Sequence, residues 1–298
     1  MGVLAPRVVI VRRETEFERV RAVYATAASA RFVLERKGLK LEAIEAAHAE
    51  FAAALRHARA AIPSDWRQSI IMRDEIAGFV FGPDDIVVAI GQDGLVANVA
   101  KYLDGQTVIG VDPNPGANAG QLVRFAPADL AAMLPAAAAH RLKLDARVMV
   151  LARLDNGEEL LALNEIFVGH RSHQSARYTL KLGQRSERQS SSGLIVATGT
   201  GATGWAASIL LATRRSLDLT PTAARLGLLV REPWPGPRTG TSLVAEVVEQ
   251  EPVVVTSEMD YGGTVFADGI ESDRLSFAWG RSVSIKPAER RLMLALPE

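Results

Sequence analysis

Hydrophobic and polar positions follow two different rhythms along this chain. In the first part, short apolar runs are separated by longer segments with the 3.6-residue period of amphipathic helices. This pattern predicts buried strands at 7–12, 69–72, 86–90 and 107–111, and helices that begin near Thr15, span 41–61 and span 95–103. Strands that alternate with helices in this way are typical of an open, mostly parallel sheet with flanking helices.

The later part has shorter runs in which apolar and polar residues alternate. It predicts strands at 147–154, 160–168, 177–182, 193–197, 226–230, 252–257, 264–267 and 274–277, with two more between 282 and 296. Asp155-Asn156-Gly157 predicts a hairpin turn, because Asn-Gly suits a type I′ turn. One helix is expected at 204–215, and the alanine-rich segment 136–139 is expected to be helical. We therefore expect an α/β N-terminal domain at 1–130 and a β-rich C-terminal domain at 131–282.

Composition narrows the functional classes. The 298 residues are 48% hydrophobic, enough for a sizeable core, and no run of 18 apolar residues suggests a membrane span. The 34 basic and 34 acidic residues cancel, which argues against nucleic acid and membrane surfaces as partners. The absence of cysteine excludes disulfides, thiolate metal sites and cysteine nucleophiles. With strand-like residues from Val8 onward leaving no room for a targeting peptide, we expect a cytoplasmic protein.

Two glycine-rich loops carry the candidate chemistry. Gly91-Gln92-Asp93-Gly94 follows the apolar run 86–90, and the loop 198–205, Thr-Gly-Thr-Gly-Ala-Thr-Gly-Trp, follows the run 194–197. Each joins a strand-like segment to a helix-like one, where exposed backbone N–H groups can face an anion. Because each half of the chain supplies one loop, we expect the site where the halves meet. The pair favours phosphoryl transfer onto a nucleotide.

Asp93 is the candidate for proton transfer. A carboxylate at the carboxyl end of a parallel strand could accept a proton from an attacking hydroxyl or help to hold magnesium. An ordinary Asp-Gly turn is the competing interpretation. Neither a P-loop nor a Rossmann fingerprint is present in the sequence.

Three motifs in order resemble those of the NAD kinase family. Gly91–Gly94 matches its Gly-Gly-Asp-Gly loop, Asn164-Glu165 matches its Asn-Glu pair, and 198–205 matches its threonine- and glycine-rich loop. Order and spacing agree over roughly 85–210. Ser191-Ser192-Gly193-Leu194, the final Trp205 and Arg231-Glu232-Pro233 are most similar to the mitochondrial-type branch.

The resemblance implies phosphorylation of the adenosine 2′-hydroxyl of NAD by ATP and Mg²⁺, giving NADP, in a homodimer or larger homo-oligomer. It also implies that residues 283–298 return to the first domain. Asp93 would be the base, and Gly91, Gln92 and Gly94 would form the donor loop. Residues from the second half would bind NAD: Asn164, Glu165, Thr198, Thr200, Gly201, Thr203, Gly204, Trp205 and Ser208.

Two departures from the family pattern leave other functions open. Gln92 replaces a glycine of the first loop, and Leu95 stands where a small polar residue is usual. If they abolish donor binding, the chain is a nucleotide-binding protein without catalysis. A related kinase with a lipid or sugar acceptor is the other alternative.

Three further features have more than one interpretation. His170 and His173 suit surface loop positions better than a metal pair. Arg12-Arg13 is interpreted as a solvated strand end rather than a phosphate clamp, although it ends a strand near the expected ligand edge. Asp268-Gly269 is either a pocket contact or a hairpin turn.

Overall fold

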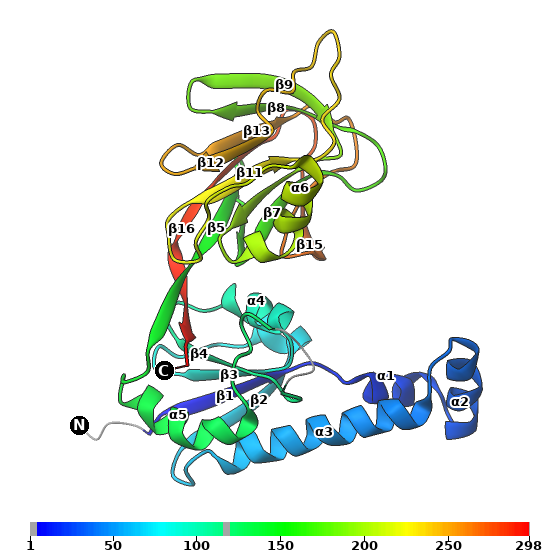
Figure 1. Ribbon diagram of the computed structural model, residues 1–298, viewed down its shortest axis with the longest axis vertical. Helices are drawn as coiled ribbons and strands as arrows, with labels where there is room; N and C mark the ends of the chain where they lie inside the picture. Colours follow the sequence, from blue (N-terminus) through cyan, green and yellow to red (C-terminus); the bar gives the residue numbers. More distant parts are fainter. Residues whose placement is uncertain (1–4, 116–119, 298) are drawn as a thin grey trace. The chain divides into compact units, whose positions relative to one another are not determined.

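The computed structural model describes residues 5–115 and 120–297, which divide into two compact units (Figure 1). The first unit comprises residues up to Asp145 together with the segment from Met293, and the second comprises Ala146–Leu292. The division falls after Asp145 rather than near residue 130. The reason is that the helix over 130–138 packs its buried side chains into the core of the first unit.

The first unit is an α/β domain. Its elements are β1 (Arg7–Arg12), α1 (Glu16–Val23), α2 (Ala27–Arg36), α3 (Leu41–Ala60), β2 (Arg67–Met72), the 3₁₀ helix η1 (Arg73–Gly78), β3 (Ile86–Ile90), α4 (Asp93–Ala100), β4 (Thr107–Val111), the 3₁₀ helix η2 (Pro127–Asp129) and α5 (Leu130–Ala138). Strands β2, β1, β3 and β4 lie side by side and are all parallel. The predicted parallel sheet is therefore confirmed.

Both faces of this sheet are covered, which explains its continuous apolar strands. On one face, Val8, Ile10 and Val88 pack against the carboxyl-terminal part of α3 and against α5. On the other face lies α4, whose residues from Leu95 to Ala100 are all buried (Figure 1). The sheet thus holds the chain that follows β3 in a fixed position.

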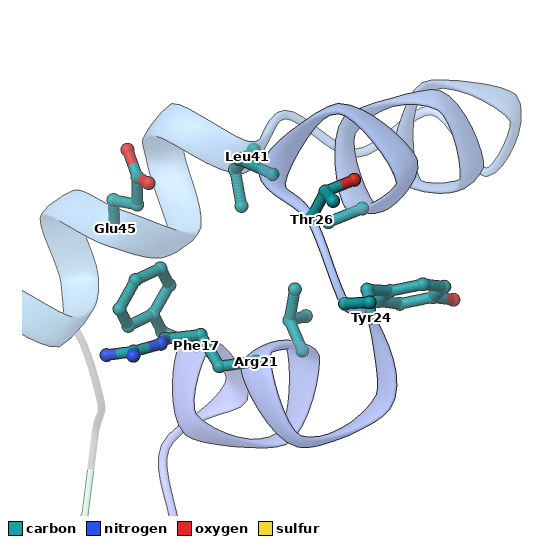
Figure 2. A pocket seen from close by; sticks show the side chains of 10 residues that line it. Phe17, Arg21, Tyr24, Thr26, Leu41 and Glu45 are labelled. Atoms are coloured by element: carbon teal, nitrogen blue, oxygen red, sulfur yellow. The ribbon is translucent and has the colours of Figure 1, made fainter.

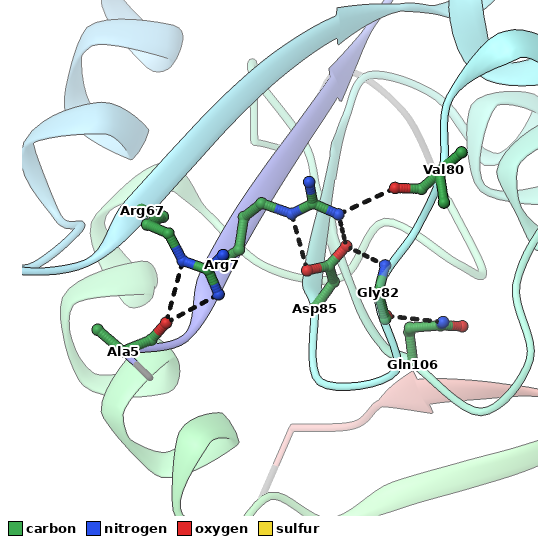
Figure 3. Close-up of polar contacts among 7 residues, drawn as sticks. All are labelled: Ala5, Arg7, Arg67, Val80, Gly82, Asp85 and Gln106. Atoms are coloured by element: carbon green, nitrogen blue, oxygen red, sulfur yellow. Dashed lines mark hydrogen bonds and ion pairs between the residues drawn. The ribbon is translucent and has the colours of Figure 1, made fainter. Parts of the chain in front are cut away.

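The polar cluster at the amino-terminal end of this sheet is structural. Arg7 donates through Nε and Nη2 to the Asp85 carboxylate and also to the Val80 carbonyl (Figure 3). Asp85 in turn accepts from the Gly82 amide, and Gln106 donates to the Gly82 carbonyl. These bonds fix the loop that leads into β3.

The second unit is built from antiparallel strands. Its elements are β5 (Leu144–Leu154), β6 (Glu159–Ala162), β7 (Glu165–His170), β8 (Ala176–Leu182), β9 (Arg185–Ser191), β10 (Leu194–Thr198), the 3₁₀ helix η3 (Gly201–Thr203), α6 (Trp205–Thr213), β11 (Leu226–Val230), β12 (Ala245–Val248), β13 (Val253–Ser257), β14 (Gly263–Ala267), β15 (Ile270–Ser276) and β16 (Ser282–Ala295). One sheet has the order β12-β11-β10-β7-β14-β15. The other joins β16, β13, β8 and β9, with β5 and β6 beside β16.

Alternation along the strands builds the core between these two sheets. Ile166 and Val168 of β7 point inward, while Phe167 points to the outer face, where α6 packs. The expected hairpin at 155–157 joins β5 to β6, with Gly157 at a φ of 91°. The α/β first part and the β-rich second part are thus both confirmed.

Several predicted boundaries were wrong. The run 160–168 is two strands, β6 and β7, because the chain breaks at Leu163-Asn164. The two strands expected between 282 and 296 are one long strand, β16, that pairs with β13 at Val283 and with β4 at Met293. The α2 helix, β9 and β12 were not expected.

Candidate functional site

The first loop lies where the parallel strands of the first unit end. Gly91 directly follows β3, its amide donates to the Val111 carbonyl of β4, and α4 begins at Asp93. The carboxyl ends of parallel strands are the edge at which open α/β sheets bind ligands. The loop therefore presents the first turn of a helix, with its unpaired amides, at that edge.

Neither Gln92 nor Leu95 distorts this loop. Gln92 has a φ of −105°, which any L-residue adopts, and its side chain is exposed. Leu95 is fully buried beneath the loop, where a Cβ on Gly91 would lie 3.3 Å from its Cδ2. Leu95 therefore supports the loop from the core.

The Asp93 carboxylate is bound to the backbone of a second segment of the first unit. Oδ2 accepts from the Gln121 amide at 2.7 Å, and Oδ1 accepts from those of Leu122 and Val123 at 2.9 and 3.2 Å. The approach is close, because a Cβ on Gly120 would lie 2.9 Å from Oδ1. A carboxylate has about four acceptor positions, so roughly one on Oδ2 is still available.

In the second unit, Asn164 and Glu165 stand at the break between β6 and β7. Asp268 accepts from three consecutive amides there: Leu163 to Oδ2, and Asn164 and Glu165 to Oδ1, at 3.1, 2.7 and 3.3 Å. Asp268 and Gly269 both have positive φ, 51° and 69°, and form the turn between β14 and β15. Asp268-Gly269 is therefore both a hairpin turn and a contact to the Asn-Glu segment.

The threonine- and glycine-rich loop packs directly on this break. The buried Thr198 hydroxyl donates to the Leu163 carbonyl at 2.5 Å and accepts from the amides of Thr200 and Gly201. A Cβ on Gly201 would lie 2.3 Å from the Asn164 carbonyl oxygen, so only glycine fits this approach. The structure thus brings together Asn164, Glu165, Thr198, Thr200 and Gly201, and the Thr198 hydroxyl serves the loop itself.

The rest of this loop leads into α6. Thr203 donates to the Thr200 carbonyl, and Gly204 precedes the helix. Trp205 packs in the outer layer, stacked on Phe167 with ring centroids 5.7 Å apart, and the Arg231 guanidinium lies 5.1 Å from its ring centroid. Ser208 is exposed one turn further along α6.

Trp205 also borders a pocket of about 390 Å³ on the outer face of the six-stranded sheet. Its lining combines aromatic rings with cationic side chains: Phe167, Trp205, Phe266, Arg171, Arg231 and Arg274. The hydroxyl of Thr264, which is 2% exposed, lies in this lining without a hydrogen-bond partner among the described residues.

Sequence reasoning did not identify two contributors to these loops. Arg147, at the start of β5, is buried and its Nη1 lies 3.4 Å from the Thr200 hydroxyl. The Gln121–Val123 segment was not expected as the partner of Asp93. In both cases the partner lies far along the chain, so no local pattern signals the contact.

A second pocket, of about 300 Å³, lies among α1, α2 and α3 (Figure 2). Phe17, Tyr24 and Leu41 line it together with Arg21 and Glu45. None of the site residues expected from the sequence belongs to it.

The residues that the structure describes contain neither a metal-binding cluster nor a membrane-spanning helix. Across 5–115 and 120–297, no group of three or more His, Asp or Glu side chains is arranged to hold a metal ion. His170 accepts through Nδ1 from the Ser172 amide and meets Tyr261 edge to face. Among the helices of the described chain, none has the length and hydrophobicity to cross a membrane.

Comparison with known proteins supports the resemblance seen in the sequence. No protein-family model matches the chain. The NAD kinase of Burkholderia vietnamiensis is 32% identical over 131 residues, which cover 42% of this chain and 43% of that protein. The aligned part is thus less than half of either chain.

Two solved structures share the fold. One is an NAD kinase from Archaeoglobus fulgidus in complex with ATP, 18% identical, with a TM-score of 0.61 over 98% of this chain and 94% of that one. The other is yeast NADH kinase complexed with NADH, 12% identical, with a TM-score of 0.63 over 99% and 84% of the two chains. This chain therefore shares its two-part fold with both of these structures.

Proposed function

We propose that this chain is an NAD kinase that transfers the terminal phosphoryl group of ATP to the adenosine 2′-hydroxyl of NAD. One observation carries the proposal. The Gly91–Gly94 loop and the Asn164-Glu165 segment are each held by an aspartate that accepts three consecutive backbone amides. The relative, and the ATP and NADH in the two solved structures, support the choice of substrates.

Asp93 is the proposed proton acceptor. Its Oδ2 accepts one amide bond while Oδ1 accepts two, so Oδ2 has room for a substrate hydroxyl. As the 2′-oxygen bonds to the terminal phosphorus of ATP, its proton passes to Oδ2, the phosphoanhydride P–O bond breaks and ADP leaves. The protein's contribution to such a transfer is mainly positioning and charge stabilisation.

The residues of the first loop fit Mg²⁺ only when the ion binds together with the phosphates of ATP. Mg²⁺ usually keeps several waters and binds one or two carboxylates together with substrate phosphates. Asp93 is the carboxylate of the first loop, and most of its acceptor positions are taken by amides. Bound in this way, the ion would neutralise part of the phosphate charge.

Asn164 and Glu165 are proposed to bind the adenine nucleoside of NAD, with Thr200, Thr203 and Gly204 beside them. Asp268 accepts from the Asn164 amide, and the Thr198 hydroxyl joins the Leu163 carbonyl to the Thr200 amide, so the 163–165 segment and the 198–205 loop are fixed to each other. Trp205 contributes an aromatic wall, whose position is set by Phe167 and Arg231.

We further assign the chain to the mitochondrial-type branch. The segments that carry that similarity lie together in the second unit. The Ser192 amide donates to the Arg231 carbonyl, the Arg231 amide donates to the Gly193 carbonyl, and Arg231 lies beside Trp205. Their contact supports treating them as one feature rather than three separate coincidences.

The experiment is NADP formation from NAD, ATP and Mg²⁺, read through an NADP-specific dehydrogenase. We expect activity in the wild type, and a fall in kcat of roughly a hundredfold or more in Asp93→Asn. The asparagine would also turn an amide group toward backbone N–H donors, so circular dichroism and thermal unfolding must accompany the assay. Asp84→Asn, an exposed aspartate before β3, is the matched control and should keep full activity.

The outcomes separate the alternatives. Near-normal turnover in a folded Asp93→Asn protein would remove Asp93 from its role. A wild type that binds NAD by calorimetry yet forms no NADP would favour the non-catalytic protein. Failure to bind NAD would favour a kinase with another acceptor.

A further inference from the structure

Two arginines, Arg13 and Arg73, directly follow the neighbouring strands β1 and β2 at the edge that carries the first loop. Arg12 is opposite Met72 of β2 and opposite Ile90 of β3 in the parallel registers. The next residues, Arg13, Arg73 and Gly91, therefore leave the sheet side by side at its carboxyl edge. This is the ligand edge of an open α/β sheet.

Arg12 and Arg13 differ in their hydrogen bonding: the Arg12 guanidinium has partners, and the Nε of Arg13 has none in the described ranges. Arg12 donates to both carboxylate oxygens of Glu18, at 3.0 and 2.9 Å, and lies near the Phe51 ring. The buried Nε of Arg13 has no hydrogen-bond partner in the described ranges. Arg12 is thus structural, and Arg13 is not accounted for by the fold.

Arg13 lies in a cationic environment. Burial lowers the pKa of its guanidinium, and the charges of Arg73 and Arg19 lower it further. Within 5–115 and 120–297, no ion pair joins any of these three arginines to a carboxylate. Three like charges are therefore held near one another without a counter-charge from the described chain.

The arginine also faces the start of α4. Its Nη2 lies 3.4 Å from the position that a Cβ on Gly94 would occupy. The first turn of a helix has unpaired amides and a positive dipole end, so it adds to the positive potential of the guanidinium. A side chain larger than glycine at 94 would stand between Arg13 and this turn.

We propose that Arg13, backed by Arg73 and Arg19, binds the terminal phosphates of the phosphoryl donor. This rests on the proposed function and names the donor's recognised group as a polyphosphate. A guanidinium offers a planar fork of donors that matches phosphate oxygens. A triphosphate carries enough negative charge to neutralise all three arginines, whereas an uncharged sugar or lipid hydroxyl does not.

The test is isothermal titration of the full chain with three probes: the β,γ-imido analogue of ATP, inorganic triphosphate, and NAD. In Arg13→Ala we expect affinity for both triphosphates to fall by about tenfold or more, because a charge-assisted bidentate contact is lost. Arg13→Lys should lose part of that affinity. NAD affinity should stay within about twofold, since the NAD-binding residues proposed above lie in the second unit. Arg67→Ala, on β2 with its side chain bonded to the Ala5 carbonyl, is the control and should bind all probes normally.

Thermal unfolding distinguishes a role of Arg13 in phosphate binding from a role in the stability of the fold. Removing an unpaired, mutually repelled cation should leave the apo Tm unchanged or raise it. A lowered Tm with unchanged triphosphate affinity would assign Arg13 to the fold and overturn the proposal, as would a wild type that binds neither triphosphate. Loss of NAD binding alone in Arg13→Ala would place the arginine at the acceptor instead. A wild type that binds both triphosphates but makes no NADP would count against the proposed function and not against this inference.

Discussion

Asp93 and Asp268 have the same role in the backbone of their two units. Each carboxylate accepts hydrogen bonds from three consecutive amides, at 121–123 and at 163–165. Of these residues, 121–123 and 163–164 lie outside the helices and strands, and Glu165 is the first residue of β7. Replacing either aspartate therefore leaves several partly buried N–H groups without partners.

Asp268 offers a graded test of this role. In Asp268→Asn, the side-chain oxygen can still accept from Asn164 and Glu165, and asparagine tolerates the observed φ of 51°. Asp268→Ala loses all three bonds and adds strain at that φ. We expect the alanine variant to lose roughly 2–4 kcal/mol of unfolding free energy and the asparagine variant to lose less.

Urea unfolding would measure the loss of stability, and titration with NAD would measure binding. If the hydrogen bonds from Asp268 shape the 163–165 segment for NAD, both variants should bind NAD more weakly, in the same order as their loss of stability. An alanine variant as stable as the wild type would show that Asp268 holds nothing.

At the scale of single elements, the start of α1 is determined by a local network. Thr15 and Glu18 form a capping box, and His48 of α3 contacts the Thr15 hydroxyl at 2.9 Å. Hydrogen bonds from Arg12 outweigh the effect of burial and, with the Thr15 amide, lower the pKa of Glu18 to about 2 from its ordinary 4.5. One carboxylate therefore links β1 to α1.

The network predicts a defined pH dependence. Because the pKa of Glu18 is lowered in the folded chain, its stabilisation is present above pH 4.5 and is lost as the pH falls toward 2. At pH 7, Glu18→Gln should unfold with about 1–2 kcal/mol less free energy, a figure reduced for partial solvent exposure. Unfolding at a series of pH values should show the two proteins converging below pH 4.5, and a constant gap would contradict the assignment.

Apolar periodicity predicted the elements whose side chains face a core, and it failed where other forces decide. β1, β3, β10 and β11 have continuous apolar runs and were all expected. β9, Arg-Ser-Glu-Arg-Gln-Ser-Ser, has no apolar residue and is a strand because it pairs with β8 along its whole length. Such pairing is a tertiary property that no local pattern reports.

Part of the candidate site could likewise be predicted from the sequence, and part could not. Loop positions and residue types could be identified from the sequence, since glycines and an aspartate after an apolar run have a local signature. The partners of Asp93 lie 28 to 30 residues away, and those of Asp268 lie 103 to 105 residues away. These contacts depend on the folded path of the chain, so they could not be predicted from the sequence.

For the molecule as a whole, the end of the chain completes the first unit. Met293 and Leu294 pair with Thr107 and Val108 of β4, and Ala295 lies in the core beside the α3 and α5 residues. The Leu296 amide donates to the Lys143 carbonyl. The first unit thus includes a segment that the whole second unit separates from it along the sequence.

Removing residues 293–298 should therefore destabilise the first unit more than the size of the deletion suggests. The edge of β4 would lose its partner strand, and unpaired edges favour aggregation. We expect a Tm lower by several degrees or a separate early transition in calorimetry, while deletion of 297–298 alone should have little effect. An unchanged unfolding curve for the longer deletion would show that the pairing with β4 contributes nothing.

The hydrogen bonds that Asp93 and Asp268 accept from backbone amides also affect the entropy of ligand binding. Fixing the backbone of one residue costs roughly 1–2 kcal/mol of conformational free energy, and both loops incur that cost when the chain folds. A nucleotide that meets a preorganised backbone has little left to order, so more of its contact energy is available as affinity. Because partly buried carboxylates hold these loops, a change that weakens either set of hydrogen bonds should lower both the stability of the fold and the affinity for the ligand.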